Sequence, residues 1–152
     1  MQIVSAQKGD AEFIIAFNQK MALETENRRL PDDVIGPGVH AMLDDPQKGL
    51  YLLAKNENGE ILGQLMVTFE WSDWRNATFW WIQSVYVAPE ARRQGVYRLL
   101  HERVRTMAQE SQKACGIRLY VEKENRGAQK TYEDLGMHHS HYFMYEEDWS
   151  AN

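Results

Sequence analysis

The stretch from Arg92 to Arg98 carries residue types that suit phosphate binding. It contains three arginines and one glycine, Gly95, and it lies directly before a helical pattern. Glycine lets a backbone approach a ligand closely, and the free amides of a helix's first turn attract an anion. Neighbouring arginines add ionic contacts that match phosphate oxygens. The stretch therefore predicts a site for a phosphorylated cofactor.

The elements on either side of this stretch would place it at the end of a buried strand. Phe79 to Val87 is apolar apart from Gln83 and Ser84, as expected for a central strand, and it stops at Ala88-Pro89. A helical pattern then runs from Gly95 to about Ser111. The order strand, basic loop and helix start is typical of a phosphate-binding turn.

The remaining pattern predicts one mixed α/β domain over residues 1–152, with antiparallel hairpins first and crossover helices later. A second helix starts at Pro31, and the internal Gly36-Pro37-Gly38 should break or shorten it. Asn58-Gly59 is a strong hairpin signal. The other expected elements are strands at Gln2 to Ser5, Tyr51 to Lys55, Ile61 to Phe69 and Ile117 to Val121, helices at Ala11 to about Thr25 and Asn125 to Leu135, and a final strand pair at Met137 to Glu146.

Two motifs together resemble a known family. Arg92-x-x-Gly95-x-Tyr97, after a strand ending Val85-Tyr86-Val87-Ala88-Pro89, resembles the acyl-CoA signature Gln/Arg-x-x-Gly-x-Gly/Ala of the GNAT superfamily of N-acetyltransferases. Asn125-x-x-Ala128-x-x-x-Tyr132-x-x-Leu135-Gly136-Met137 resembles its second conserved block. The element order matches the GNAT-like fold over nearly the whole chain, a central mixed sheet flanked by about four helices. Tyr97 departs from the usual small residue, so its side chain must turn away from the pyrophosphate.

The resemblance implies an acetyl-CoA site with no metal. The backbone of Val85 and Val87 would pair with the pantetheine arm, and the loop amides would hold the pyrophosphate. Asn125 could cap its helix, contact the cofactor, or do both. The cofactor-binding residues implied in this way are Val85, Tyr86, Val87, Arg92, Arg93, Gln94, Gly95, Val96, Tyr97, Arg98 and Asn125.

Acetyl transfer to an amine needs three proton or charge adjustments. A lysine-like ammonium, with a pKa of about 10.4, must lose a proton before it attacks. The oxyanion needs a donor, which a backbone N–H near Val85 could supply. The leaving CoA thiolate benefits from a proton, and Tyr132 occupies the position where family members often place a tyrosine beside the sulfur. The alternative for Tyr132 is a core aromatic on the Ala128 and Leu135 face of its helix.

The sequence leaves the general base and the acceptor pocket open. Many relatives carry a glutamate near the position of Gln83, but an amide cannot accept the proton. Glu70 is a candidate base. Glu24 and Glu26 are alternative bases and candidate acceptor-site residues. Each of the three also fits a surface carboxylate, and a water chain would serve as well. In the Ser72 to Asn76 loop, Trp74 could form a wall of the acceptor pocket and hold a cation over its ring.

Composition limits the other classes. The length of 152 residues fits one domain, and a formal charge of −5 argues against nucleic acid as a general partner. Cys115 is the only cysteine, which excludes an internal disulfide and fits a reducing compartment. We find no signal peptide or membrane-spanning run, so the sequence predicts a cytoplasmic protein without a membrane partner. His138-His139-x-His141 places at most two side chains on one strand face, which excludes a metal site.

The favoured function is an N-acetyltransferase that moves acetyl from acetyl-CoA to a primary amine of a small molecule by direct attack. A non-catalytic acyl-CoA-binding regulatory module is the alternative that Gln83 and Tyr97 favour. A protein N-terminal or lysine acetyltransferase differs only in its acceptor, and would need an open groove where the Pro31 to Asp45 and Ser72 to Asn76 segments meet. Exposed late strands such as Ser140 to Tyr145 could pair in a homodimer.

Overall fold

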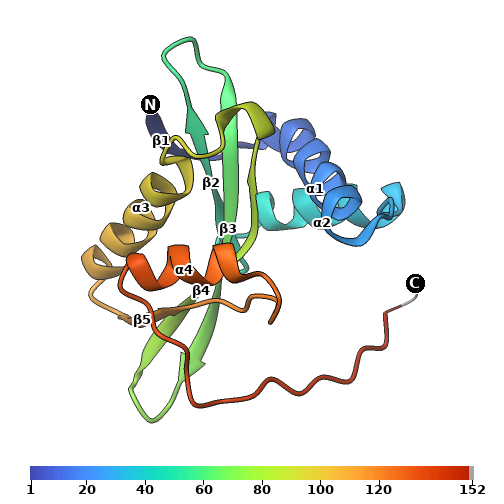
Figure 1. Cartoon of the computed structure of the whole chain (residues 1–152). Helices are drawn as coiled ribbons and strands as arrows, with labels where there is room; N and C mark the ends of the chain where they lie inside the picture. Colours follow the sequence, from blue (N-terminus) through green and yellow to red (C-terminus); the bar gives the residue numbers. More distant parts are fainter. Residues whose placement is uncertain (151–152) are drawn as a thin grey trace. The chain divides into compact units, whose positions relative to one another are not determined.

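A computed structural model describes residues 1–150 of the chain (Figure 1). The chain divides into two compact units, of which the first covers Met1–Leu119 and the second begins at Tyr120. The first unit contains all five strands and three of the α-helices, and the second contains the remaining α-helix. The two units are described separately below.

The first unit is built on one five-stranded mixed sheet with the strand order β1-β2-β3-β4-β5. The first four strands pair antiparallel, and β5 pairs parallel to β4 across the helix that connects them. The strands are β1 (Gln2–Ser5), β2 (Gly49–Lys55), β3 (Ile61–Ser72), β4 (Ala77–Val87) and β5 (Ala114–Arg118). The mixed α/β fold expected from the sequence is confirmed. The last strand of this unit lies three residues earlier than expected, since β5 covers Ala114–Arg118 and the sequence predicted Ile117 to Val121.

The β2–β3 hairpin forms where the sequence predicts it. Gly59 adopts the left-handed conformation (φ 82°) that glycine tolerates best. The side-chain oxygen of Asn56 accepts hydrogen bonds from the amides of Asn58 and Glu60, each at 2.9 Å. The turn therefore closes through one asparagine side chain, and the two strands continue with few interruptions on either side.

Helices cover both faces of this sheet (Figure 1). Helices α1 (Ala11–Glu26) and α2 (Asp32–Asp44) pack on one face, and α3 (Val96–Glu110) packs on the other. Because side chains alternate along a strand, neighbouring residues of β2 enter different cores. Leu52 belongs to the cluster that contains Leu100 of α3, whereas Leu53 belongs to the cluster that contains Ile14 of α1 and Val39 of α2.

Helix α2 differs from the sequence prediction. Gly36-Pro37-Gly38 was expected to break or shorten it, but the helix runs unbroken over 13 residues with Pro37 inside. Proline removes one helical hydrogen bond and crowds the preceding turn. Burial outweighs that cost, since Val39 and Met42, two and five residues after Pro37, are packed into the core. Tertiary packing has overridden local propensity here.

The second unit contains α4 (Arg126–Asp134) followed by a long extended segment. The side chain of Asn125 caps the helix by accepting a hydrogen bond from the amide of Ala128 at 3.1 Å. Past Gly136 (φ 95°), the predicted strand pair from Met137 to Glu146 is wrong, since no residue there is in a strand. Among the described residues, 138–147 form no backbone–backbone hydrogen bond, and a strand requires a paired neighbour.

Candidate functional site

Strand β4 has one edge that is only partly paired. On the β3 side its pairing extends from Ala77 to Val87. On the β5 side the pairing covers only Thr78 to Trp81. The strand past Trp81 therefore has no β-partner on that side among residues 1–150. The N–H and C=O groups of such an edge can pair with an extended ligand.

A β-bulge lies in the middle of this partly paired stretch. Gln64 of β3 faces Tyr86 and Met66 faces Gln83, so Ser84 and Val85 together oppose one residue of β3. Ser84 adopts a left-handed conformation (φ 51°), and its carbonyl accepts a hydrogen bond from Nε2 of the fully buried Gln64 at 3.3 Å. A buried amide therefore holds the bulge from inside. The bulge takes Val85, the expected source of an oxyanion donor, out of the regular ladder.

Strand β4 leads directly into the predicted phosphate loop. After a short 3₁₀ helix at Pro89–Ala91, Arg93 (φ 62°) and Gly95 (φ 79°) are both left-handed, and α3 begins at Val96. Nothing lies within 4 Å of a Cβ placed on Gly95, so the glycine is needed for its backbone conformation and leaves open space in front of the helix.

Neither the N-cap nor the first turn of α3 provides a neutralising side chain. Its N-cap is Gly95, which has no side chain to accept the first-turn amides, and its first turn contains no acidic residue. By contrast, α2 carries Asp32 and Asp33 in its first turn. The uncompensated amides and the helix dipole give the start of α3 a positive potential that suits an anion.

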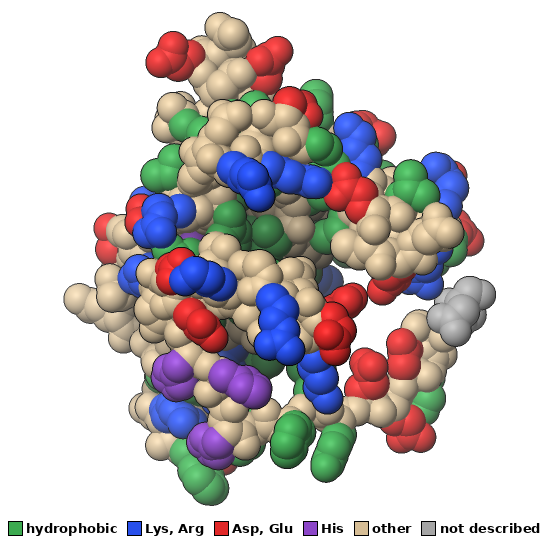
Figure 2. Space-filling view, viewed as in Figure 1, with side chains coloured by type: hydrophobic (Ala, Val, Ile, Leu, Met, Phe, Trp, Pro, Cys, Tyr) green, Lys and Arg blue, Asp and Glu red, His purple; other side chains and the backbone are tan. Residues whose placement is uncertain are grey.

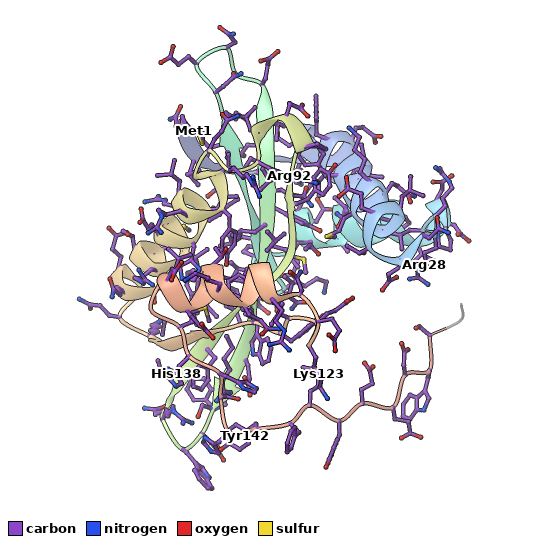
Figure 3. The ribbon with its side chains drawn as sticks, in the orientation of Figure 1. Met1, Arg28, Arg92, Lys123, His138 and Tyr142 are labelled. Carbon is purple, nitrogen blue, oxygen red and sulfur yellow. The ribbon has the colours of Figure 1, made fainter. Side chains whose placement is uncertain are left out.

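The arginines of the loop differ in their roles. The Arg92 guanidinium donates to the carboxylate of Glu24 at 2.8 Å and to the carbonyl of Val87 at 2.9 Å, and lies over the ring of Tyr86 (Figure 3). Arg92 therefore ties the loop to α1 and to β4. Arg93 and Arg98 are exposed and form no ion pair within residues 1–150, so their charges face solvent.

Tyr97 lies along the helix, as its size requires. Its hydroxyl is hydrogen-bonded to Nδ1 of His101 at 3.0 Å, one turn further along α3. The guanidinium of Arg105 approaches Nε2 of the same histidine at 3.3 Å. Because a guanidinium can only donate, Nε2 is the acceptor and Nδ1 carries the proton toward the Tyr97 oxygen. Gln94 is held separately, since its side chain donates to the carbonyl of Glu90 at 2.9 Å.

The environment of Glu70 disfavours a role as base. Its carboxylate accepts hydrogen bonds from the Trp81 indole at 2.8 Å and from Arg118 at 2.9 Å. The Trp81 hydrogen bond and the Arg118 charge hold the pKa of Glu70 below its usual range. A carboxylate stabilised in this way takes up a proton poorly. Gln83 of β4 donates a hydrogen bond to the hydroxyl of Thr68 on β3.

The acceptor candidates are spread over two places in the first unit. Trp74 lies in the β3–β4 turn with its side chain almost fully exposed. Glu24 and Glu26 lie in the last turn of α1, where Glu24 also accepts a hydrogen bond from the Tyr86 hydroxyl at 3.3 Å, and Glu26 pairs with Arg28. No hydrogen bond or ion pair among the described residues joins Trp74 to either glutamate.

In the second unit, Tyr132 is half-buried on α4. Burial raises the pKa of its phenol, so the hydroxyl keeps its proton at neutral pH. A protonated phenol can donate to a thiolate. The chemistry of Tyr132 is therefore compatible with the acid role that the resemblance implies.

Sequence reasoning missed two contributors to the site, Gln64, which supports the bulge, and His101, which orients Tyr97. It named Glu24 as an acceptor candidate but did not indicate that Glu24 fixes Arg92. Gln64 was visible as a polar residue in an apolar run, and His101 lies four positions after Tyr97 on the buried side of a helix. The link from Glu24 to Arg92 joins residues far apart in the chain, and no local pattern indicates it.

Within residues 1–150, no three His, Cys, Asp or Glu side chains are grouped so that they could hold a metal ion. No helix in this range combines the length and apolar character needed to cross a membrane.

Comparisons with known proteins identify the family. The model of the Acetyltransferase (GNAT) family matches residues 13–137, which takes in parts of both units. The structure of a possible acetyltransferase from Clostridium difficile 630 is 42% identical with a TM-score of 0.90, over 99% of this chain and 98% of that one. Two further solved structures share the fold. One is a probable acetyltransferase with 24% identity and a TM-score of 0.88 over 100% of both chains. The other is a transcriptional regulator from Bacillus halodurans C-125 with 24% identity and a TM-score of 0.80, over 97% of this chain and 99% of that one. A search of curated proteins gave no match. The chain belongs to the GNAT acetyltransferase family.

Proposed function

We propose that this protein transfers the acetyl group of acetyl-CoA to a primary amine of a small molecule. The observation that carries the proposal is the continuity of two features in the first unit. The partly paired edge of β4 leads, through the loop from Arg92 to Gly95, to the uncapped N-terminus of α3. An extended chain that ends in a pyrophosphate requires both features in this order.

The donor would be bound mostly by backbone groups. The β4 edge at Val85, Tyr86 and Val87 offers N–H and C=O groups to the amide bonds of pantetheine. The pyrophosphate would lie at the amides of residues 94–98, with Arg93 and Arg98 as charge partners. Arg92 has a different role in this proposal, because its contacts with Glu24 and Val87 fix the shape of the loop.

The reaction is a direct displacement. The neutral amine attacks the thioester carbonyl carbon, the C–S bond breaks, and the CoA thiolate takes a proton. The amide of Val85, displaced from the ladder by the bulge, would stabilise the oxyanion. Tyr132 would supply the proton to the thiolate. Water would carry away the amine proton, since Trp81 and Arg118 stabilise the ionised form of Glu70.

Thiol release measures this activity directly. Purified protein is incubated with acetyl-CoA and a panel of polyamines, aminoglycosides and amino acids, and free CoA is followed with a thiol reagent. The expected result is amine-dependent thiol release together with a higher melting temperature in acetyl-CoA. Protein that is not stabilised by acetyl-CoA and releases no thiol would contradict the proposal.

A non-catalytic acyl-CoA-binding module is the second candidate. The observation that favours it is Gln83, whose amide is hydrogen-bonded to Thr68 at the position where many relatives carry a carboxylate. Stabilisation by acetyl-CoA without turnover of any amine, including peptide amines, would support this candidate over the enzyme.

A further inference from the structure

Gln64 is a fully buried amide in the middle of β3. It pairs with Leu53 of β2 on one side and with Tyr86 of β4 on the other. Leu53 belongs to the core cluster of α1 and α2, and the ring centroid of Tyr86 lies 4.9 Å from that of Phe17 in α1. Because directly opposite residues share a face of the sheet, Gln64 also points toward α1. A polar group buried there costs free energy unless it is hydrogen-bonded.

Only one end of this amide has a partner within residues 1–150. Nε2 donates to the carbonyl of Ser84 at 3.3 Å, whereas no described group donates to Oε1. An amide that is bonded at one end recovers little of its desolvation cost, and an apolar side chain of similar size would suit the core at least as well. Stability of the core therefore does not account for Gln64, and its hydrogen bond to Ser84 does.

That hydrogen bond reaches the strained point of β4. Ser84 is left-handed (φ 51°), a conformation that residues other than glycine rarely adopt. It begins the bulge in which Ser84 and Val85 together oppose one residue of β3. A strained backbone persists only where its surroundings hold it, and such points concentrate at functional sites. Gln64 is the buried side chain that holds this one.

The same hydrogen bond sets the direction of the Val85 amide. No peptide bond among residues 1–150 is cis, so the C=O of Ser84 and the N–H of Val85 lie in one trans plane and point in opposite directions. The C=O points toward Gln64 on β3, and the N–H therefore points away from β3. On that side β5 pairs with β4 only as far as Trp81. The Val85 N–H is thus directed at the open edge, where the proposed thioester would lie.

We propose that Gln64 is a positioning residue for acetyl transfer, whose amide fixes the Ser84–Val85 peptide so that the Val85 N–H is aimed at the developing oxyanion. This inference rests on the proposed function and adds the residue that orients its oxyanion donor. A donor aimed in advance stabilises the oxyanion without reorganisation during the reaction. Lys and Arg side chains gather at the surface in Figure 2 where Figure 3 labels Arg92, whereas Gln64 is fully buried. Its influence on the reaction therefore passes through the β4 backbone.

Gln64→Met removes the donor and keeps an unbranched side chain that adapts to a core. Without the hydrogen bond the peptide can turn, and a misplacement of about 1 Å costs a reaction about 100-fold in rate. We expect kcat to fall about 100-fold, while KM and Kd for acetyl-CoA stay within about twofold and the melting temperature within about 3 °C of native. Native kcat in this variant would overturn the proposal. Equal losses in kcat and in acetyl-CoA binding would overturn it too, since they would indicate general damage.

Leu53→Met is the matched control for packing. Leu53 is fully buried directly opposite Gln64, and this change alters the core beside Gln64 without removing a hydrogen bond. A swap that conserves volume is well tolerated, so kcat should stay within about threefold of native. A loss as large as that of Gln64→Met would show that packing, and not the hydrogen bond, is responsible, and would overturn the proposal.

Gln64→Glu makes the donor respond to pH. A protonated carboxyl can donate to the Ser84 carbonyl as the amide does, whereas a carboxylate only accepts and repels that oxygen. Burial raises the pKa of a carboxyl above its usual value of about 4.3, so ionisation should occur between about pH 5 and pH 9. The ratio of variant to native kcat should fall about 100-fold as the pH rises through that pKa. The exposed control Gln109→Glu, in α3, should give a constant ratio, and a constant ratio for Gln64→Glu would overturn the proposal.

Nuclear magnetic resonance tests the orientation without turnover. The ¹⁵N shift of an amide responds to hydrogen bonding at the carbonyl of the same peptide, so in Gln64→Glu the Val85 amide should titrate with the midpoint of the kcat ratio. A Val85 shift that does not titrate would overturn the proposal even in an active enzyme. Native protein that releases no thiol would contradict the proposed function, and the Val85 titration would still decide whether Gln64 orients this peptide. If circular dichroism shows that Gln64→Glu unfolds, Gln64→Met decides.

Discussion

Acid should destabilise the first unit through one buried histidine. His101 is fully buried on α3 and is hydrogen-bonded on both ring nitrogens, to Tyr97 and to Arg105. Burial, and secondarily the charge of Arg105, lowers the pKa of His101 from 6.5 to about 4. Protonation would place a second N–H against the Arg105 guanidinium, so the folded state admits the charged form poorly.

The size and sign of the effect follow from this pKa. Between pH 6.5 and 4 the unfolded chain binds a proton at this histidine that the folded chain does not bind. The free energy of unfolding therefore falls as the pH drops through this window and the loss levels off below the lower value. At about 1.36 kcal/mol per pKa unit, the loss is about 2 kcal/mol at pH 5 and about 3 kcal/mol in full.

The assay compares the native chain with His101→Gln. Urea unfolding is followed by tryptophan fluorescence at pH 7 and at pH 5 for both proteins. Glutamine does not titrate, so the variant loses packing at both pH values but not the histidine linkage. All other acid-sensitive groups are shared and cancel in the comparison. The difference in unfolding free energy between the two proteins should shrink by about 2 kcal/mol from pH 7 to pH 5.

If the free energy of unfolding fell equally between pH 7 and pH 5 in the native chain and in His101→Gln, the reasoning would be refuted. Such a result would show that His101 titrates alike in the folded and unfolded chain, and that the Arg105 contact does not exclude the proton. Arg105→Gln separates the two causes of the shift. Because burial is the larger cause, this variant should retain most of the dependence on pH.

Three further predictions concern the proposed reaction. Gly95→Ala forces a side chain into a left-handed position and into the space before α3, so it should cost about 1 kcal/mol of stability and weaken acetyl-CoA binding about tenfold by calorimetry. Glu70→Gln should leave the acid limb of the kcat/KM profile in place, because the Trp81 hydrogen bond and the Arg118 pair disfavour proton uptake by the Glu70 carboxylate; loss of that limb would show that Glu70 acts as the base. Tyr132→Phe should lower kcat about 100-fold with an unchanged Kd for acetyl-CoA, and equal losses in both would indicate a structural tyrosine.

The sequence predicted the elements whose signals are local. The central strand, the glycine at the loop and the Asn58-Gly59 hairpin all depend on residues close together in the chain, and each is where it was expected. Gly95 is the clearest case, since the sequence placed a glycine directly before the helix and Gly95 is the N-cap of α3.

What could not be predicted depends on distant contacts. Helix α2 continues through Pro37 because Val39 and Met42 are buried against other elements. The role of Arg92 depends on Glu24, which lies 68 residues earlier in the chain. The segment from Met137 to Glu146 reads as strand in its composition, but a strand forms only where an edge receives it. In each case the deciding partner lies outside the local pattern.

The open edge of β4 has a structural cause that requires no ligand. A Cβ on Gly116 of β5 would lie 2.9 Å from the ring of Phe79, so glycine allows that ring to pack against the parallel pair. The Arg118 guanidinium then stacks 3.6 Å from the centroid of the same ring and pairs with Glu70, which fixes the end of β5 beside the first half of β4. Beyond that anchor β4 continues without β5, and the bulge held by Gln64 begins. The edge proposed for pantetheine is therefore preorganised by packing within the first unit, and binding need not separate the two strands.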